Sequence, residues 1–434
     1  MAPPDDPHVR FALPSRVQFD TRVCVHCGLC VPACPTYRHL GQEADGPRGR
    51  VAILKALADG EIPLTIQAER HIDRCLGCRA CESACPSGVP YGRLLEDARS
   101  ALGPVQQARQ GWLARVVRRL LLASLLVPAR LAAAAKLLRW YGGSRLQALA
   151  RRTGLVRLLP GPLRAMEAMT PVVAPPVEYR PAGGVVPARG DRRRRVALLT
   201  GCVQDALYSG VNAATVRVLA TFGCEVVLPE AQACCGAVHQ HAGDRATARS
   251  LARRNVDAFL AADVDAVVVN AAGCAAHMKE YAELLADDAA YAERARRLVS
   301  LVREVSELLV ELPAPPDPRP VPLVVTYQDP CHGAHAQRIR AQPRKLLQGI
   351  PGLVLRELAT PDRCCGSAGI YNVVQHDLSM AILAAKMEDV RRTGAEAIVT
   401  ANPGCALQLG HGSRVHGLGL PVYHLIEILD RAYA

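Results

Sequence analysis

Eight cysteines near the N-terminus form two runs of identical spacing. The first run follows the pattern C-x2-C-x2-C-x3-C-P and comprises Cys24, Cys27, Cys30, Cys34 and Pro35. The second run repeats the pattern with Cys75, Cys78, Cys81, Cys85 and Pro86. Three thiolates on a short loop can hold three iron atoms of a cubic cluster, and a fourth ligand must then come from elsewhere. The paired run can supply that ligand.

This spacing is typical of bacterial ferredoxins with two [4Fe–4S] clusters, in which the fourth cysteine of each run binds the other cluster. We therefore expect the first cluster to be held by Cys24, Cys27, Cys30 and Cys85. The second should be held by Cys75, Cys78, Cys81 and Cys34. Zinc is the alternative metal, but zinc ribbons use paired C-x2-C knuckles rather than three-cysteine runs that end in Cys-Pro.

The segment between the two runs, residues 46–61, has apolar residues at helical spacing after Pro47. This periodicity predicts a helix inserted between the two halves of the cluster-binding unit. Arg48 and Arg50 lie in this segment. They either stabilise nearby carbonyls and cluster charge, or they are simply solvated.

A second group of cysteines is duplicated in the C-terminal half. The first copy comprises Cys202, Cys234, Cys235 and Cys274. The second copy comprises Cys331, Cys364, Cys365 and Cys405. Glycine follows the adjacent pair in both, so we call each copy a CCG domain. Four converging thiolates suit a further cluster or metal ion; a redox dithiol and plain buried cysteines are the alternatives. Of the 17 cysteines only Cys224 remains, and it is expected to be a small buried side chain.

The elements that position these cysteines alternate between two periodicities. Short β-branched runs end at or near a cysteine in residues 195–202, 265–274, 322–331 and 397–405, and helical patterns fill the gaps. Such alternation predicts parallel sheets whose sites lie at the carboxyl ends of the strands. We expect a multidomain α+β and α/β chain. Its parts are a ferredoxin-like helical domain (15–100), a basic helical and proline-rich linker (101–195) and two CCG domains (196–312 and 320–434).

The positive charge is concentrated in the linker. The whole chain has a net charge of +12, whereas residues 101–195 contain 18 Lys and Arg against 3 Asp and Glu. Residues 111–141 read as two cationic amphipathic helices divided by Pro128, and the linker ends in the four arginines 192–195. The segment is either a connector packed on its own protein or a surface that lies on an anionic membrane. Nucleic acid is not expected as a partner, because stacking aromatics and a binding fold are missing.

Targeting signals are not visible in the sequence. The first residues contain acids and prolines where a signal peptide needs a basic and then an apolar stretch. No apolar run approaches the length of a membrane span. We therefore expect a cytoplasmic location, either free or peripheral on the inner face of the cytoplasmic membrane. In the cytoplasm, clustered cysteines more often bind metals than form disulfides.

Together these features resemble a known family, the iron–sulfur subunits of glycolate oxidase (glycolate dehydrogenase). The resemblance covers residues from about 20 to the C-terminus. It is carried by the strings CVHCGLCVPACPTY, DGPRGR, IDRCLGCRACESACPSGV, CCGAV, CCGSAGIY and IVTANPGC. In related heterodisulfide reductase subunits each CCG domain ends in C-x-x-C. Here His277 and Gln408 stand where the last cysteine would be, and His277 is either a substitute ligand or an ordinary polar side chain near a helix start.

The resemblance implies an electron-transfer subunit without catalytic residues of its own. A flavin-containing partner would oxidise glycolate to glyoxylate, and two [4Fe–4S] clusters would pass the electrons toward a membrane quinone. His241 and His335 either protonate that quinone or are ordinary histidines. D-lactate and glycerol 3-phosphate are the alternative substrates of the complex. The alternative from another class is a zinc-binding interaction protein.

Overall fold

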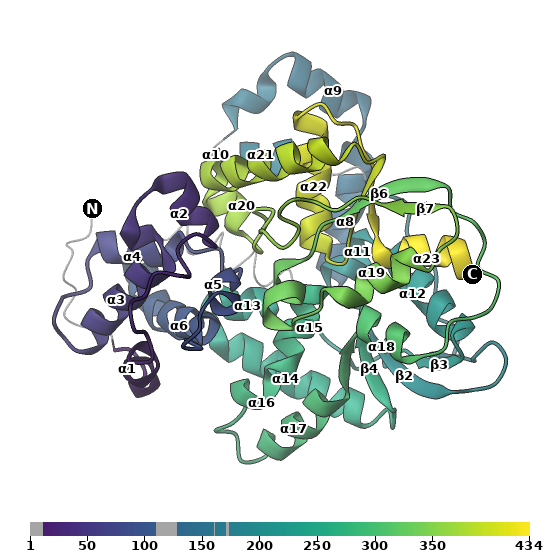
Figure 1. The fold of residues 1–434 in the computed structure, drawn as a ribbon, viewed down its shortest axis with the longest axis horizontal. Helices are drawn as coiled ribbons and strands as arrows, with labels where there is room; N and C mark the ends of the chain where they lie inside the picture. Colours follow the sequence, from purple (N-terminus) through teal and green to yellow (C-terminus); the bar gives the residue numbers. More distant parts are fainter. Residues whose placement is uncertain (1–11, 110–127, 160, 171–172) are drawn as a thin grey trace.

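The N-terminal unit is a small helical domain. The computed structural model describes residues 12–109, 128–159, 161–170 and 173–434. The unit is built from α1 (Ser15–Thr21), α2 (Pro35–Leu40), η1 (Glu43–Asp45), α3 (Pro47–Ala58), α4 (Ile66–Asp73), α5 (Ala80–Ser83) and α6 (Tyr91–Arg109). Figure 1 shows it in purple at one end of the molecule.

The core of this unit follows from the helical spacing of its apolar residues. Val51 and Leu54 of α3 pack with Ile72 of α4 and Leu94 of α6, and all four are almost fully buried. Residues i and i+3 lie on one helix face, so the segment between the cysteine runs is a helix, as expected. The first cysteine loop joins α1 to α2, and the second joins α4 to α6. The core therefore holds both loops on one support.

Helix α6 crosses residue 100, where the linker was expected to begin. The described part of the linker contains α8 (Pro128–Tyr141), α9 (Arg145–Arg152), η2 (Leu155–Leu158) and α10 (Gly161–Ala168). A helix begins at Pro128, as the sequence predicts; the cationic helix expected before it lies outside the described residues. In the described parts of the chain, no helix has both the length and the apolar character needed to cross a membrane.

The first CCG domain contains a five-stranded sheet with the order β1-β3-β2-β4-β5. Its strands are β1 (Val185–Val186), β2 (Arg194–Leu199), β3 (Cys224–Val227), β4 (Ala266–Val269) and β5 (Val302–Glu304). All neighbouring pairs are parallel except β1 with β3. The helices are α11 (Val203–Leu207), α12 (Ser209–Thr221), α13 (Ala237–His241), α14 (Arg245–Leu260), α15 (Ala272–Lys279), α16 (Tyr281–Leu284), α17 (Ala292–Leu301) and α18 (Val305–Glu311).

The second CCG domain repeats the same strand order in a four-stranded, fully parallel sheet, β7-β6-β8-β9. Its strands are β6 (Leu323–Tyr327), β7 (Leu353–Leu355), β8 (Ala397–Thr400) and β9 (Val422–His424). Its helices are η3 (His332–Ala336), α19 (Ala341–Gln348), α20 (Tyr371–Val374), α21 (His376–Thr393), α22 (Pro403–Val415) and α23 (Leu425–Tyr433). The short parallel sheets expected from the sequence are present in both copies.

The two CCG domains share one apolar core. Strand residues of both sheets and the inner faces of α12 and α23 belong to a single buried cluster. At its edge the rings of Phe222 and Tyr433 meet edge to face, 5.3 Å apart. His424 also links the copies, because its Nε2–H donates to the Asn270 carbonyl at 2.8 Å while Nδ1 accepts from the Ile426 amide. The duplicated half is therefore one packed body.

The N-terminal unit contacts both CCG domains. Helix α6 packs on α13 of the first copy, whereas α2 packs on α21 and α5 on η3 of the second. Ion pairs from Arg79 to Glu280 and from Arg93 to Glu283 reinforce the junction with the first copy. In Figure 1 the purple helices face both the teal and the yellow-green parts of the body.

Candidate metal centres

The first cysteine set lies around a pocket at the surface of the N-terminal unit. Cys24, Cys27, Cys30 and Cys85 all line it, and Cys27 is exposed. Burial raises the pKa of the Cys30 thiol, and Cys24, Cys85 and Cys27 raise it further. Mutual repulsion among thiolates is the electrostatic problem that a positively charged metal centre solves. The structure thus brings together the four cysteines expected at the first cluster.

The second set, Cys34 with Cys75, Cys78 and Cys81, is buried. Burial raises the pKa of Cys78 well above its usual value, and Cys331, Cys75 and Cys34 add to the shift. Burial also raises the pKa of Cys81 well above its usual value, and Cys78, Cys75 and Cys34 raise it further. The backbone amide of Gly77 donates to Cys75 Sγ at 3.4 Å. The four thiols expected at the second cluster are therefore neighbours.

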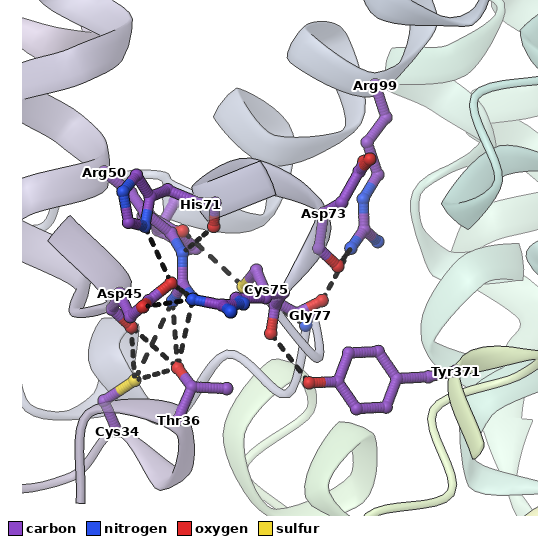
Figure 2. A network of polar contacts seen from close by, with 12 residues as sticks. Cys34, Thr36, Asp45, Arg50, His71, Asp73, Cys75, Gly77, Arg99 and Tyr371 are labelled. Carbon is purple, nitrogen blue, oxygen red and sulfur yellow. Dashed lines mark hydrogen bonds and ion pairs between the residues drawn. The ribbon is translucent and has the colours of Figure 1, made fainter. Parts of the chain in front are cut away.

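A buried arginine joins the two cysteine runs (Figure 2). The side chain of Arg50 is 1% exposed, and its Nε donates to the His71 carbonyl at 2.6 Å. Its Nη1 donates to Thr36 Oγ1 at 3.1 Å and lies 3.9 Å from Cys34 Sγ. The solvated alternative for Arg50 is therefore wrong. Arg48 is partly exposed and pairs with Glu43.

The charge of Arg50 reaches the other cysteine run as well. Burial raises the pKa of Cys75, but the positive charges of Arg50 and Arg99 outweigh burial, and the pKa is lowered. Arg99 also donates to the Cys75 carbonyl at 2.6 Å, as Figure 2 shows. Positive charge near a thiolate favours the charged form. The surroundings of Cys75 therefore suit an anionic metal ligand.

Each CCG domain gathers its four cysteines in the same order. In the first copy Cys234 Sγ donates to Cys202 Sγ at 3.3 Å. The thiols interact in the order Cys202, Cys234, Cys235, Cys274. The second copy repeats this order with Cys331, Cys364, Cys365 and Cys405. Both sets lie beyond the carboxyl ends of parallel strands, as the topology requires.

The adjacent cysteine pair in each copy depends on the glycine that follows it. Gly236 has φ +89° and Gly366 has φ +92°, which side chains disfavour. A Cβ on Gly366 would lie 2.6 Å from the Ser379 carbonyl oxygen. Cys224 lies away from both sets, fully buried at the start of β3, as predicted.

The second cysteine set of the N-terminal unit lies against the second CCG domain. Leu76 and Cys78 share one buried apolar cluster with Cys364 and Tyr371. Tyr371 Oη donates to the Arg74 carbonyl at 2.9 Å. A ring nitrogen of His332 meets the Gly77 carbonyl at 3.0 Å. Sequence spacing does not predict this proximity, because the hydrogen-bonded residues are 255 and 297 positions apart.

The histidines singled out in the sequence lie in different surroundings. His241 pairs with Glu96 at 3.1 Å; burial raises the pKa of Glu96, but His241 outweighs burial, and the pKa falls to about 2. His335 lies between Ser83 Oγ and the Asp362 carbonyl. His277 is buried, and neither of its ring nitrogens has a partner. Gln408, its counterpart, is buried and hydrogen-bonded.

The four cysteine sets share an all-thiolate composition. Among the described residues, no group of three or more His, Cys, Asp or Glu side chains is positioned to hold a single metal ion. A tetrahedral zinc site would need four ligands about 2.0–2.3 Å from one point. A [4Fe–4S] cluster instead has one thiolate on each of its irons, so its ligands lie around a larger body. The all-thiolate composition of all four sets agrees with that chemistry.

Comparison with protein families agrees with this arrangement. The model described as a 4Fe-4S dicluster domain matches residues 20–89. The cysteine-rich domain matches residues 196–279 and 325–410. The linker region of the glycolate oxidase iron-sulfur subunit matches residues 113–170. Fold and sites thus define a two-cluster iron–sulfur protein joined to a pair of cysteine-rich domains.

Similarity to curated proteins extends along the whole chain. The chain is 43% identical to the probable glycolate oxidase iron-sulfur subunit of Bacillus subtilis, over 94% of this chain and 93% of the relative. It is 36% identical to the glycolate oxidase iron-sulfur subunit of Escherichia coli, over 95% of this chain and 94% of that relative. The chain belongs to the family of glycolate oxidase iron–sulfur subunits, which are electron-transfer subunits, and iron–sulfur clusters are its cofactors.

Two further similarities are more limited. Lactate utilization protein A of Shouchella clausii is 33% identical over 54% of this chain and 98% of its own length. The crystal structure of a hypothetical protein from Helicobacter pylori has a TM-score of 0.53 at 9% identity, over 90% of this chain and 68% of that chain. The latter shows a likeness of fold alone.

Proposed function

We propose that this chain carries electrons from a flavin-containing partner, which oxidises glycolate to glyoxylate, toward a membrane quinone. Four cysteine sets in one packed body carry the proposal. When bound, [4Fe–4S] clusters accept and donate single electrons. We assign the first to Cys24, Cys27, Cys30 and Cys85 and the second to Cys75, Cys78, Cys81 and Cys34. The CCG cysteines supply at least one further centre.

The burial of the sets suggests the order of the relay. Cys27 is exposed at the pocket that the first cysteine set lines, so a partner can approach the first set closely. The second set is enclosed between the N-terminal unit and the second CCG domain, where Cys78 and Cys364 share an apolar cluster. We therefore place the first set toward the flavin-containing partner. The buried second set then lies between it and the CCG centres.

Glycolate is favoured over the alternative substrates by the extent of similarity. The two glycolate oxidase relatives match this chain over nearly its full length, linker included. The lactate utilization relative matches only 54% of the chain. D-lactate and glycerol 3-phosphate remain the substrates to compare, because the site that would distinguish them lies in the partner subunit.

The linker is proposed to rest on the inner face of the cytoplasmic membrane. Exposed apolar side chains gather on it, and we call them the linker surface: Leu137, Trp140, Leu146, Leu149, Leu155, Leu158, Leu163 and Met166. Exposed cations accompany them: Arg130, Lys136, Arg145, Arg152 and Arg157. This combination of exposed apolar and cationic side chains suits an anionic lipid surface. The connector role also holds, since Arg139 donates to the carbonyls of Ala174 and Ala206.

The test is substrate-dependent reduction in the intact complex. The chain is purified anaerobically with its partner subunits, and glycolate, D-lactate or glycerol 3-phosphate is added in turn. Electron paramagnetic resonance should then detect reduced [4Fe–4S] clusters, and their signals should appear fastest when glycolate is the substrate. Equal or faster reduction by another substrate would change the assignment of substrate. A colourless protein with stoichiometric zinc and no acid-labile sulfide would favour the zinc-binding alternative.

A further inference from the structure

The two CCG domains differ at one buried position. Cys274 and His277 lie three residues apart in α15, and Cys405 and Gln408 have the same spacing in α22. This spacing places the members of each pair on one helix face. His277 Nε2 lies 3.5 Å from where a Cβ on Gly236 would be, and Gln408 Nε2 lies 3.4 Å from the same point on Gly366. The imidazole and the amide therefore occupy equivalent places beside the two cysteine pairs.

In the second copy this place is closed by hydrogen bonds. Gln408 Nε2 donates to Ser379 Oγ at 3.0 Å, and its Oε1 accepts from Asn372 Nδ2 at 3.1 Å. Ser379 Oγ in turn donates to the Gly366 carbonyl at 2.8 Å. Gln408 is 1% exposed. Both the nitrogen and the oxygen of the amide are thus hydrogen-bonded within the protein.

In the first copy the ring at the equivalent place has no hydrogen-bond partner, and it lines a pocket with Glu96 and Glu280. Ala248 packs against Gly236 as Ser379 packs against Gly366, but alanine has no hydroxyl to meet the ring. His277 is 2% exposed, and both Nδ1 and Nε2 lack a partner. Its ring instead packs edge to face with the rings of Tyr281 and His241, with ring centroids 5.5 Å and 6.3 Å apart. Buried polar groups normally have partners, so two free nitrogens beside a cysteine set need an explanation.

The state of the ring suits a metal ligand. The ring is buried and no hydrogen-bond partner occupies either nitrogen. A neutral imidazole has one nitrogen with a free lone pair. Neutral imidazole binds iron and zinc readily.

We propose that His277 supplies an imidazole ligand to an iron-containing centre held by Cys202, Cys234, Cys235 and Cys274. This inference rests on the proposed function, in which the CCG cysteines hold a metal centre. The second copy cannot make such a bond, because its amide is engaged by Ser379 and Asn372. The two repeats therefore hold different centres. A neutral imidazole adds no negative charge to the four thiolates, whereas a thiolate at this position would add one.

The test uses pulsed electron paramagnetic resonance on the full chain, purified anaerobically with natural or ¹⁵N-labelled histidine. The wild type should show hyperfine coupling from one directly bound histidine nitrogen. The coupling should be lost in His277→Gln. It should persist in His239→Gln, a matched control in the same domain whose ring pairs with Asp244. A second variant, His277→Cys, should keep the iron of this centre but lose the nitrogen coupling and lower the potential.

The outcomes separate this inference from the relay itself. Two ferredoxin-type clusters account for about eight irons, so a wild-type iron content above eight is expected. A content above eight without nitrogen coupling, or coupling that survives in His277→Gln, would overturn the ligand assignment. A content of about eight would overturn it too, while leaving the two-cluster relay intact. The relay alone is overturned if the ferredoxin-type signals are missing.

Discussion

Arg50 is expected to set the reduction potential of the buried second cluster. Its guanidinium is enclosed between the two cysteine runs, 3.9 Å from Cys34 Sγ, and its charge lowers the pKa of Cys75. Reduction adds a negative charge to the centre that these cysteines hold. A nearby positive charge stabilises the reduced state. Arg50→Gln removes that charge, so the potential should become more negative.

The size of the shift follows from the distance between Arg50 Nη1 and Cys34 Sγ. Two unit charges 3.9 Å apart interact by about 4 kcal/mol at an effective dielectric constant of about 20. The added electron is spread over the whole centre rather than placed on Cys34, so roughly half, or about 2 kcal/mol, is expected. For a one-electron couple this corresponds to a fall of roughly 90 mV.

The assay is an anaerobic redox titration of the full chain, followed by electron paramagnetic resonance. Arg50→Lys keeps the charge and should shift the potential by much less than Arg50→Gln. Arg48→Gln is the matched control, because Arg48 lies two residues away but is partly exposed and pairs with Glu43. It should leave the second cluster unchanged. Iron content is measured in every variant to show that the clusters are present.

One result would refute this reasoning. If Arg50→Gln retains its full iron content and the potential of the second cluster stays within about 20 mV of the wild type, the buried charge does not act as the Coulomb argument requires. An equal shift in Arg48→Gln would contradict it as well, since exposed charges are screened by solvent.

Four other changes test separate parts of the structure. Cys78→Ser should remove about half of the ferredoxin-type iron and block quinone reduction, yet spare flavin reduction in the partner; loss of both would contradict the relay. Gly49→Ala puts a Cβ 2.1 Å from a backbone oxygen and should cost about 2 kcal/mol or more in urea unfolding, unlike Gly410→Ala in open space. Burial lowers the pKa of His424 to about 4, so the free energy of unfolding should fall by about 3 kcal/mol as pH drops from about 6.5 toward 4. In urea titrations, His424→Gln should reduce this dependence on pH. An equal dependence in wild type and variant would show that His424 is not its cause. Serine in place of the leucines of the linker surface should weaken sedimentation with anionic vesicles at least several-fold, and unchanged binding at low salt would exclude the membrane role.

Much of the site is local enough to be predicted from spacing. A run such as Cys24 to Cys34 forms one loop, and its pattern alone indicates which cysteine crosses to the other cluster. The repeat is equally visible, because β-branched runs ending at cysteine predict strands whose carboxyl ends carry the sites. The antiparallel strand β1 was not predicted, since its two residues are too short for any periodicity.

Other features depend on packing between distant segments. Nothing in the spacing tells whether Arg50 is solvated or buried; α3 and α4 enclose it only in the folded unit. The arginines 192–195 were read as part of the linker, but Arg194 and Arg195 begin β2, and Arg192 and Arg195 pair with Glu225. The difference between His277 and Gln408 has meaning only once Ala248 and Ser379 are seen to lie at the same place.

The central claim is that this chain holds two [4Fe–4S] clusters that transfer electrons. The most direct measurement is the iron and acid-labile sulfide content of the anaerobically purified chain, together with its electron paramagnetic resonance spectrum after reduction. The account predicts at least about eight irons and eight sulfides per chain, with signals from two [4Fe–4S] clusters. Stoichiometric zinc without sulfide, or iron without any signal on reduction, would contradict it.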